Sequence, residues 1–254
     1  MRRLLSCLFL LYLLCFQPAA MQAQSYYFQY RSARYPHLQP DSSRPAPRAI
    51  DSLLHHYAAQ LVQDMTDTLA CTALPLTKAQ PESTIGNLLA DALLFKARQQ
   101  DASVAAALLT YSSIGADFIA PGPITRQTAY QLMPHNDLAV ILELSGQWLQ
   151  QLCDTIAMHR GWPLSGISFI IDSNRATDLR VAGTPVNPYI RYRIACNDFV
   201  TANRLFYQQT AGAPVKKTPA GFSITTALIF YLQQQNKPGN CLHSVLENRI
   251  TYAE

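Results

Sequence analysis

The sequence predicts a single α+β domain in which a mixed β-sheet is flanked by helices. The chain has 254 residues, of which 49% are hydrophobic and 14% charged, so it can bury a sizeable core and is unlike a disordered protein. Segments with apolar residues at helical spacing alternate with short apolar runs typical of strands. Some of these strands follow one another as in hairpins and others are separated by helices, which favours a mixed sheet.

The first 23 residues have the three-part pattern of a secretory signal peptide. Arg2 and Arg3 precede an apolar run over residues 4–16, which is followed by small residues. This run has 13 residues, whereas a membrane-spanning helix needs about 20. We therefore expect cleavage after Ala23, or alternatively after Ala20, no stable membrane anchor, and export to the periplasm or secretion.

Residues 24–49 predict an extended leader or linker, and residues 50–254 the folded domain. The leader combines arginines and aromatic residues, as do single-strand nucleic-acid platforms, but Asp41 and several prolines favour a simple leader. The formal charge of +4 includes Arg2 and Arg3, and subtracting these two leaves +2. This charge is too small to indicate a polyanion, so no nucleic-acid partner is expected.

The segment 49–65 predicts an amphipathic helix that packs on the domain, because apolar residues recur on one side of it. These are Leu53, Leu54, Tyr57, Leu61 and Met65. We interpret His55 and His56 as part of a helix face rather than as a pair of metal ligands.

The segment 82–96 predicts the helix around which the domain is organised. Its apolar stripe consists of Ile85, Leu88, Leu89, Ala92 and Leu93. Ser83 or Thr84 can supply the side-chain oxygen that accepts from the first free backbone N–H groups. Asp91 lies on the opposite flank of the stripe and is interpreted as a solvated carboxylate.

The remaining elements follow from apolar runs, helical spacing and turn residues. Strands are predicted at residues 70–76, 102–111, 138–144, 167–171, 179–181 and 190–195. Helices are predicted at residues 125–132, 147–159 and 222–235, and a turn at residues 121–123.

Four cysteines remain after the predicted cleavage: Cys71, Cys153, Cys196 and Cys241. An exported protein can form disulfides, and four cysteines allow three pairings that the sequence does not rank. Their wide spacing argues against a CxxC metal or redox motif. One disulfide and buried free thiols therefore both stay open.

Several short motifs occur in an order and spacing that resembles the C-terminal domain of 5'-nucleotidases and UDP-sugar hydrolases. These are residues 82–92 (ESTIGNLLADA), 112–115 (SSIG), 122–125 (GPIT), 132–136 (LMPHN), 142–146 (LELSG), 165–166 (SG) and 192–199 (YRIACNDF). The resemblance covers the chain from about residue 50 onward. It implies the fold of that domain, which clamps the nucleoside or sugar part of the substrate, whereas a separate metallophosphoesterase domain binds two metal ions and hydrolyses it.

The catalytic signals of that second domain are missing from the sequence. None of the six histidines stands in a D-x-H or G-N-H-[DE] context, and G-x-S-x-G, Walker A and G-x-G-x-x-G motifs are absent. The sequence therefore predicts no catalytic residue, no metal ligand and no cofactor in this chain. Divalent metals are expected only in a partner metallophosphoesterase protein, and the chain is not expected to be active alone.

The resemblance places the lip of a substrate pocket at Ser112, Ser113, His135, Asn136 and Phe199. Of these, His135 and Phe199 are the faces that can stack on a base. The family's clamping arginine and its ribose-binding aspartate fall on Gly115 and Leu205, which cannot replace them. A nucleotide or nucleoside ligand is therefore expected to bind weakly.

Two hypotheses on function follow. In the first, the chain is a stand-alone substrate-recognition domain that takes part in nucleotide catabolism, by phosphoester hydrolysis, together with a separately encoded metallophosphoesterase. In the second, it is a non-enzymatic exported binding or structural protein that keeps the fold and has lost nucleotide binding.

Overall fold

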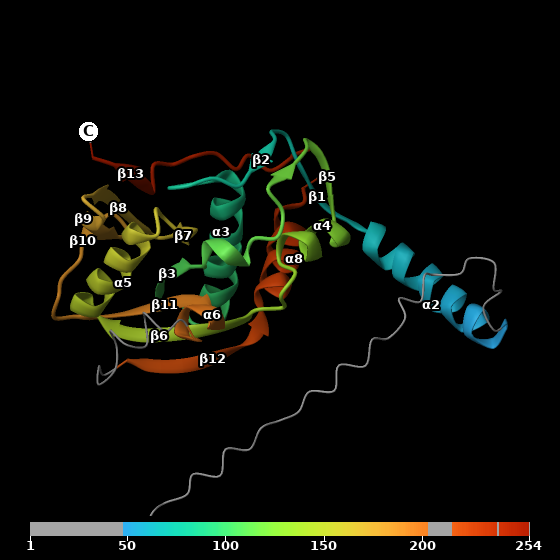
Figure 1. Ribbon diagram of the computed structural model, residues 1–254, viewed down its shortest axis with the longest axis horizontal. Coiled ribbons are helices and arrows are strands. Elements are labelled where there is room, and N and C mark those ends of the chain that lie inside the picture. Colours follow the sequence, from blue (N-terminus) through green and yellow to red (C-terminus); the bar gives the residue numbers. More distant parts are fainter. Residues whose placement is uncertain (1–47, 203–214, 238, 254) are drawn as a thin grey trace, which may run out of the picture. The chain divides into compact units, whose positions relative to one another are not determined.

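A five-stranded mixed sheet forms the centre of the domain (Figure 1). The structure, a computed structural model, describes residues 48–202, 215–237 and 239–253. In spatial order the strands are β12 (Lys216–Ser223), β6 (Leu138–Ser145), β11 (Arg191–Asn197), β3 (Val104–Leu108) and β7 (Leu164–Ser165). The pair β11 and β3 is parallel, and the other neighbours are antiparallel. The predicted α+β class with a mixed sheet is confirmed.

Helix α3 (Thr84–Gln100) packs on one face of this sheet, and its predicted apolar stripe is buried. Ser83 is the N-cap, since its side chain accepts from the backbone N–H of Gly86 at 3.0 Å. The same face carries α8 (Ile224–Gln235), which lies beside α3 (Figure 1), and the short α4 (Arg126–Leu132), both at predicted positions.

The opposite face of the central sheet packs on α5 (Gly146–Met158) and on a second sheet. Neighbouring residues of β3 show this division, because Ala107 faces α3 and α8 whereas Ala106 and Leu108 face α5. The second sheet has the order β10 (Thr184–Pro185), β9 (Arg175–Val181), β8 (Ile167–Asp172) and β13 (Ile250–Tyr252). The central sheet is thus covered on both faces.

Two small strand pairs complete the described sheets, and they differ in detail from the prediction. They are β1 (Thr68–Thr72) with β5 (Gly122–Thr125), and β2 (Leu76–Thr77) with β4 (Phe118–Ile119). The predicted strand at residues 70–76 is therefore two strands. Of the turn predicted at 121–123, residues 122 and 123 are part of β5 instead. Two further short elements are the 3-10 helix Tyr111–Ser113 and α6 (Asp198–Ala202).

The segment that follows α8 is fastened to the start of the domain. Cys241 forms a disulfide with Cys71, while Cys153 and Cys196 are free and buried. The backbone N–H of Leu242 donates to the Cys71 carbonyl at 2.7 Å. One disulfide and two buried thiols therefore coexist, and the pairing left open by the sequence is 71 with 241.

Arg249 fastens the same segment to α3, and its role corrects the interpretation of Asp91 as a solvated carboxylate. Arg249 donates to both Asp91 oxygens at 2.8 Å and to Glu247 at 3.0 Å. Glu82, just before α3, accepts from the backbone N–H groups of Glu247 and Arg249 at 2.8 and 3.0 Å. Burial acts to lower the pKa of Arg249, but its two carboxylate partners offset this effect, so the pKa is raised.

Helix α2 (Arg48–Thr66) confirms the predicted helix at 49–65 but not its packing. The side chains of Ile50, Leu54, Tyr57 and Leu61 are each more than half exposed. Apolar periodicity predicts a helix from local sequence alone, whereas its packing partner depends on the rest of the fold. The described apolar face of α2 is therefore not part of the core.

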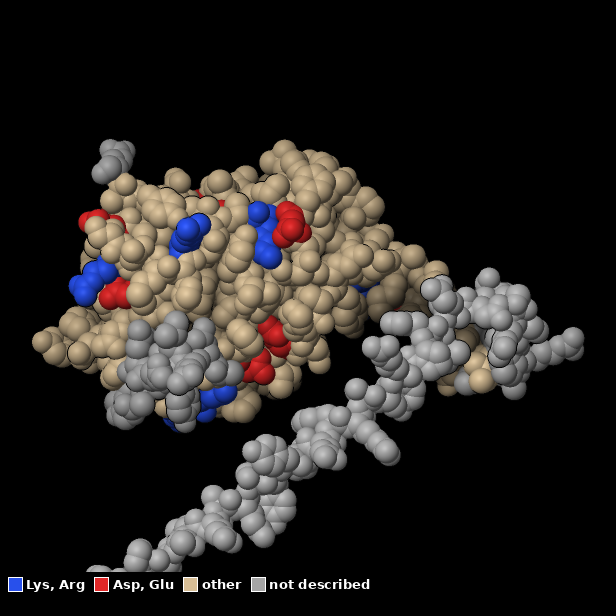
Figure 2. Space-filling model, in the orientation of Figure 1, with Lys and Arg blue, Asp and Glu red and all other residues tan. Residues whose placement is uncertain are grey.

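Other sequence predictions lie outside the described residues, among them the signal peptide and most of the leader. No helix in the described ranges is long and apolar enough to cross a membrane. On the face shown in Figure 2, acidic and basic side chains are sparse, and some of them lie beside a side chain of opposite charge.

Candidate functional site

A cavity of about 250 Å³ opens where the parallel strands β3 and β11 end. It is lined by Gln80, Thr110, Tyr111, Ser112, His159, Trp162 and Phe199. Thr110 to Ser112 begin one residue beyond the end of β3, with Leu109 between them, and Phe199 follows β11 after Asp198. Because the carboxyl ends of parallel strands meet at one edge of a sheet, the topology alone brings these two segments together.

A buried polar network holds the two strand ends in register. The side-chain amide of Asn197, at the end of β11, donates to Ser113 Oγ and to Asp137 Oδ2, each at 2.8 Å. Its oxygen accepts from the backbone N–H of Thr110 at 3.3 Å, and Ser113 donates to Asp137 at 2.7 Å. Since Asn197 is fully buried, this network fixes the turn that carries Tyr111 and Ser112.

The turn before Trp162 forms another wall. Gln80 donates from Nε2 to the carbonyls of His159 and Gly161 at 2.7 and 2.8 Å. Gly161 has φ 103°, and a Cβ there would lie 2.3 Å from the Pro81 carbonyl oxygen. Only glycine allows this close approach. The rings of His159 and Trp162 stack with centroids 6.0 Å apart.

The chemistry of the lining suits a neutral, flat ligand. No lining residue is acidic, lysine or arginine, and four of the seven carry rings. Lys78 lies nearby, but its ammonium is over the Tyr111 ring at 4.7 Å and donates to the Ile114 carbonyl at 2.9 Å. Stacking and a few neutral hydrogen-bond groups are therefore what this cavity can offer a ligand.

The structure brings together two of the five residues that the sequence places at a substrate pocket. Ser112 and Phe199 line the cavity, and Ser113 lies behind it in the polar network. His135 and Asn136 are exposed and are not among its lining residues. Asn136 has φ 50°, a backbone conformation that asparagine tolerates well. Contacts of the five residues with a ligand stay a prediction.

The position that resemblance assigns to a clamping arginine has no room for a side chain. A Cβ on Gly115 would lie 2.5 Å from the carbonyl oxygen of Gln131 and 2.7 Å from the Pro134 ring. The short loop around Pro134 therefore packs directly on Gly115. The other altered position, Leu205, is outside the described residues.

The described residues include no group of three or more histidine, cysteine, aspartate or glutamate side chains that could hold a metal ion. The two free thiols do not fit a nucleophile, since burial raises the pKa of both Cys153 and Cys196 well above the ordinary value.

Sequence reasoning did not identify Gln80, Tyr111, His159 and Trp162 as lining residues. Tyr111 directly precedes the Ser112–Ser113 turn, so proximity in the chain could have indicated it. Gln80, His159 and Trp162 come from two distant loops, and their approach depends on contacts such as the one between Gly161 and Pro81.

The fold and cavity define an α+β domain with a cavity lined by aromatic rings at the ends of two parallel strands. The family model of the 5'-nucleotidase C-terminal domain matches residues 58–210, which is more than half of the chain. The chain therefore belongs to this family, and the resemblance found in the sequence is confirmed.

Similar proteins extend this result to the fold. The chain is 28% identical over 88 residues to the silent protein UshA(0) of Salmonella typhimurium, a match that covers 33% of this chain and 16% of that protein. The crystal structure of a 5'-nucleotidase precursor from Thermus thermophilus has a TM-score of 0.67 and 24% identity, and covers 82% of this chain and 44% of its own. For Haemophilus influenzae NAD nucleotidase the TM-score is 0.59 at 13% identity, with 83% and 42% covered. The chain thus spans less than half the length of these proteins.

Proposed function

We propose that this domain recognises the nucleoside part of a nucleotide in the cavity between Trp162 and Phe199. On this proposal it takes part in nucleotide catabolism together with a separately encoded metallophosphoesterase. The observation that carries the proposal is a ring-lined, uncharged cavity at the ends of the parallel strands, in a chain of the 5'-nucleotidase C-terminal family.

The affinity expected for an isolated nucleoside is low. Stacking contributes roughly 1 to 3 kcal/mol per base, whereas micromolar binding needs about 8 kcal/mol. The lining offers no lysine or arginine to a phosphate, and the position of Gly115 has no space for a cationic side chain. Adenosine and AMP should therefore bind equally, with dissociation constants in the millimolar range.

The binding proposal is tested by calorimetric or NMR titration with adenosine, AMP and UDP-glucose. Phe199→Ala should weaken binding of all three ligands, because it removes a ring that can stack on them. The Phe199 side chain is 53% exposed, so its removal should not disturb the core. Tyr189→Ala removes a ring that is 92% exposed elsewhere, and serves as the matched control. Micromolar binding that survives Phe199→Ala would place the site elsewhere.

The catalytic part of the proposal is tested by phosphatase assays. The chain alone should show no turnover of AMP with any divalent metal, since the two-metal chemistry is assigned to the partner. Adding the cognate metallophosphoesterase should give activity that depends on the concentration of this chain and is lost with Phe199→Ala. Turnover by the chain alone, or no effect of the chain on the partner, contradicts this assignment.

We also propose that the protein is exported, which rests on the two arginines and 13-residue apolar run at its N-terminus. Intact-mass measurement of the protein from its native host should show a mature start near Gln24. A retained Met1 in the membrane fraction would refute export with cleavage.

The crowding at Gly115 favours an alternative, a non-enzymatic binding or structural protein that keeps the fold without nucleotide affinity. The titrations distinguish the two. Absence of binding by all three ligands supports the alternative.

A further inference from the structure

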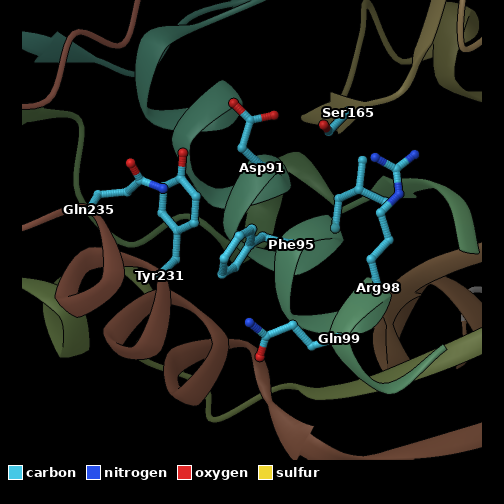
Figure 3. Close-up of a pocket in the computed structure, with 8 residues that line it drawn as sticks. Asp91, Phe95, Arg98, Gln99, Ser165, Tyr231 and Gln235 are labelled. Carbon is cyan, nitrogen blue, oxygen red and sulfur yellow. The ribbon is translucent and has the colours of Figure 1, made fainter. Parts of the chain in front are cut away.

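A second groove lies on the opposite side of the central sheet from α5, between α3 and α8. Its volume is about 420 Å³, within the range of ligand sites. Figure 3 shows the side chains that line it, with Phe95 at its centre and Tyr231 beside it. The rings of Phe95 and Tyr231 meet edge to face at 5.5 Å and 71°. From this groove we infer a binding site for a neutral carbohydrate, independent of the nucleoside cavity.

The first argument is that the groove contains hydrogen-bonding groups without partners. Within the described part of the chain, the side chains of Ser165, Tyr231, Gln99 and Gln235 form no hydrogen bond. Ser165 is only 6% exposed, yet it lines both this groove and the adjoining hollow. Its hydroxyl points toward the side of the groove that Asp91 occupies (Figure 3). The Ser165 oxygen is not among the fully buried side-chain atoms without a partner, so it reaches the surface of the groove. A ligand hydroxyl can bond to it there in place of water.

The second argument is that the charged side chains of the groove already have partners within the protein. Both oxygens of Asp91 accept from Arg249 at 2.8 Å. Arg98 donates from Nε and Nη2 to the carbonyls of Val104 and Ala105 at 2.9 Å. Only the Nη1 group of Arg98 has no hydrogen bond within the described residues, and a cation meets no carboxylate without a partner. A neutral ligand fits this balance, and the remaining lone pairs of Asp91 can accept from its hydroxyls.

The third argument distinguishes a sugar from a flat ring. A base needs two parallel faces for a sandwich, whereas Phe95 and Tyr231 stand nearly perpendicular and offer one ring face beside a polar edge. A pyranose has this same division, with an apolar C–H face and a rim of hydroxyl groups. Burial, together with the nearby charge of Asp91, raises the pKa of Tyr231, so its phenol stays a neutral donor.

The test is saturation-transfer NMR followed by titration, with methyl glycosides of glucose, galactose, mannose and N-acetylglucosamine as probes. At least one glycoside should bind in the millimolar range. Gln99→Ala and Tyr231→Phe each remove one ligand hydrogen bond and should weaken binding about fivefold. Phe95→Leu removes the ring face and should weaken it about tenfold.

Matched controls separate a site from a general effect on the fold. Gln100→Ala and Gln234→Ala change exposed amides on the same helices that do not line the groove, and should leave the affinity unchanged. Phe199→Ala should also leave it unchanged, so this inference can fail or hold without the proposed function. Circular dichroism checks that each variant folds.

Three results would overturn the inference. The first is no binding of any glycoside at tens of millimolar, and the second is binding that Phe95→Leu does not alter. The third is displacement of a bound glycoside by inorganic phosphate with loss of phosphate binding in Arg98→Ala, because the groove would then be an anion site.

Discussion

Two partly buried polar networks support the two cavities, and they differ in how their charge is balanced. The network beside the groove joins Arg249 to the carboxylates of Asp91 and Glu247, with Glu82 accepting from nearby backbone N–H groups. The network behind the cavity at the strand ends has one carboxylate, Asp137, which the amide of Asn197 and the hydroxyl of Ser113 satisfy. Removing one partner of a buried ion pair strongly destabilises the folded protein, because the other charge stays without compensation. Removing a neutral hydrogen-bond donor lowers the free energy of unfolding less. The comparison therefore predicts a ranking of mutations.

The largest effect is expected for Arg249→Met. The Arg249 side chain is 10% exposed, and its removal leaves Asp91 and Glu247 without their cation. We expect a loss of about 4 kcal/mol in the free energy of unfolding, measured by urea titration. Arg180→Met, which removes a cation from an exposed pair with Asp178, should change it by no more than about 0.5 kcal/mol. Equal losses in both variants would remove the distinction between the networks.

Removing the Cys71–Cys241 disulfide tests whether Arg249 and its carboxylate partners can hold the segment after α8 in place without it. The disulfide closes a loop with a sequence separation of 170. Replacing both cysteines by serine should lower the free energy of unfolding by about 3 kcal/mol, because the unfolded chain gains freedom. Wild-type protein in a reducing agent should match this variant. No change in either sample would mean that Arg249 and its partners are sufficient.

A smaller loss is expected in the neutral network. Asn197→Ala removes donors to Ser113 and Asp137 and should cost about 2 kcal/mol. Ser113→Ala combined with it should cost less than the sum of the single changes, because both side chains bond the same carboxylate. Urea titration of the wild type, the two single variants and the double variant measures this coupling. Strict additivity of the losses would show that Asn197 and Ser113 do not act as one network with Asp137.

The smallest effect concerns pH. The pKa of Tyr231 is raised in the folded state above its ordinary value of 10.0, through burial and the charge of Asp91. The unfolded chain then loses this proton first as pH rises, so the contribution of Tyr231 is complete below about pH 10 and is lost above it. The free energy of unfolding of Tyr231→Phe should decline less steeply above pH 10 than that of wild type. A parallel decline would show that the pKa of Tyr231 is not raised in the folded state.

The sequence predicted elements whose stabilising contacts are encoded in their own periodicity. The stripe of α3 and the apolar β6 were predicted because burial on one or both faces leaves a local pattern. Strand β12 was missed, since Lys216–Ser223 contains two lysines, a proline and a glycine and pairs with β6 as the last strand of its sheet. Its strand conformation depends on that partner.

The candidate site divides in the same way. Phe199 and Ser112 were identified through family motifs that are short and local. Trp162 was not, because its place in the cavity depends on loops far apart in the chain. The interpretation of Asp91 failed for a related reason, since its partner Arg249 is 158 residues away. Interactions over such distances leave no spacing in the sequence that predicts them.

The attachment of the last segment to the first has a consequence for synthesis. Strand β13 completes the second sheet, Arg249 neutralises a carboxylate of α3, and Cys241 bonds to β1. A ribosome must therefore release nearly the whole domain before α3 finds all its partners. Folding during translation should stall at a partly closed intermediate with an uncompensated Asp91, and chains shortened before Cys241 should be substrates for chaperones and proteases.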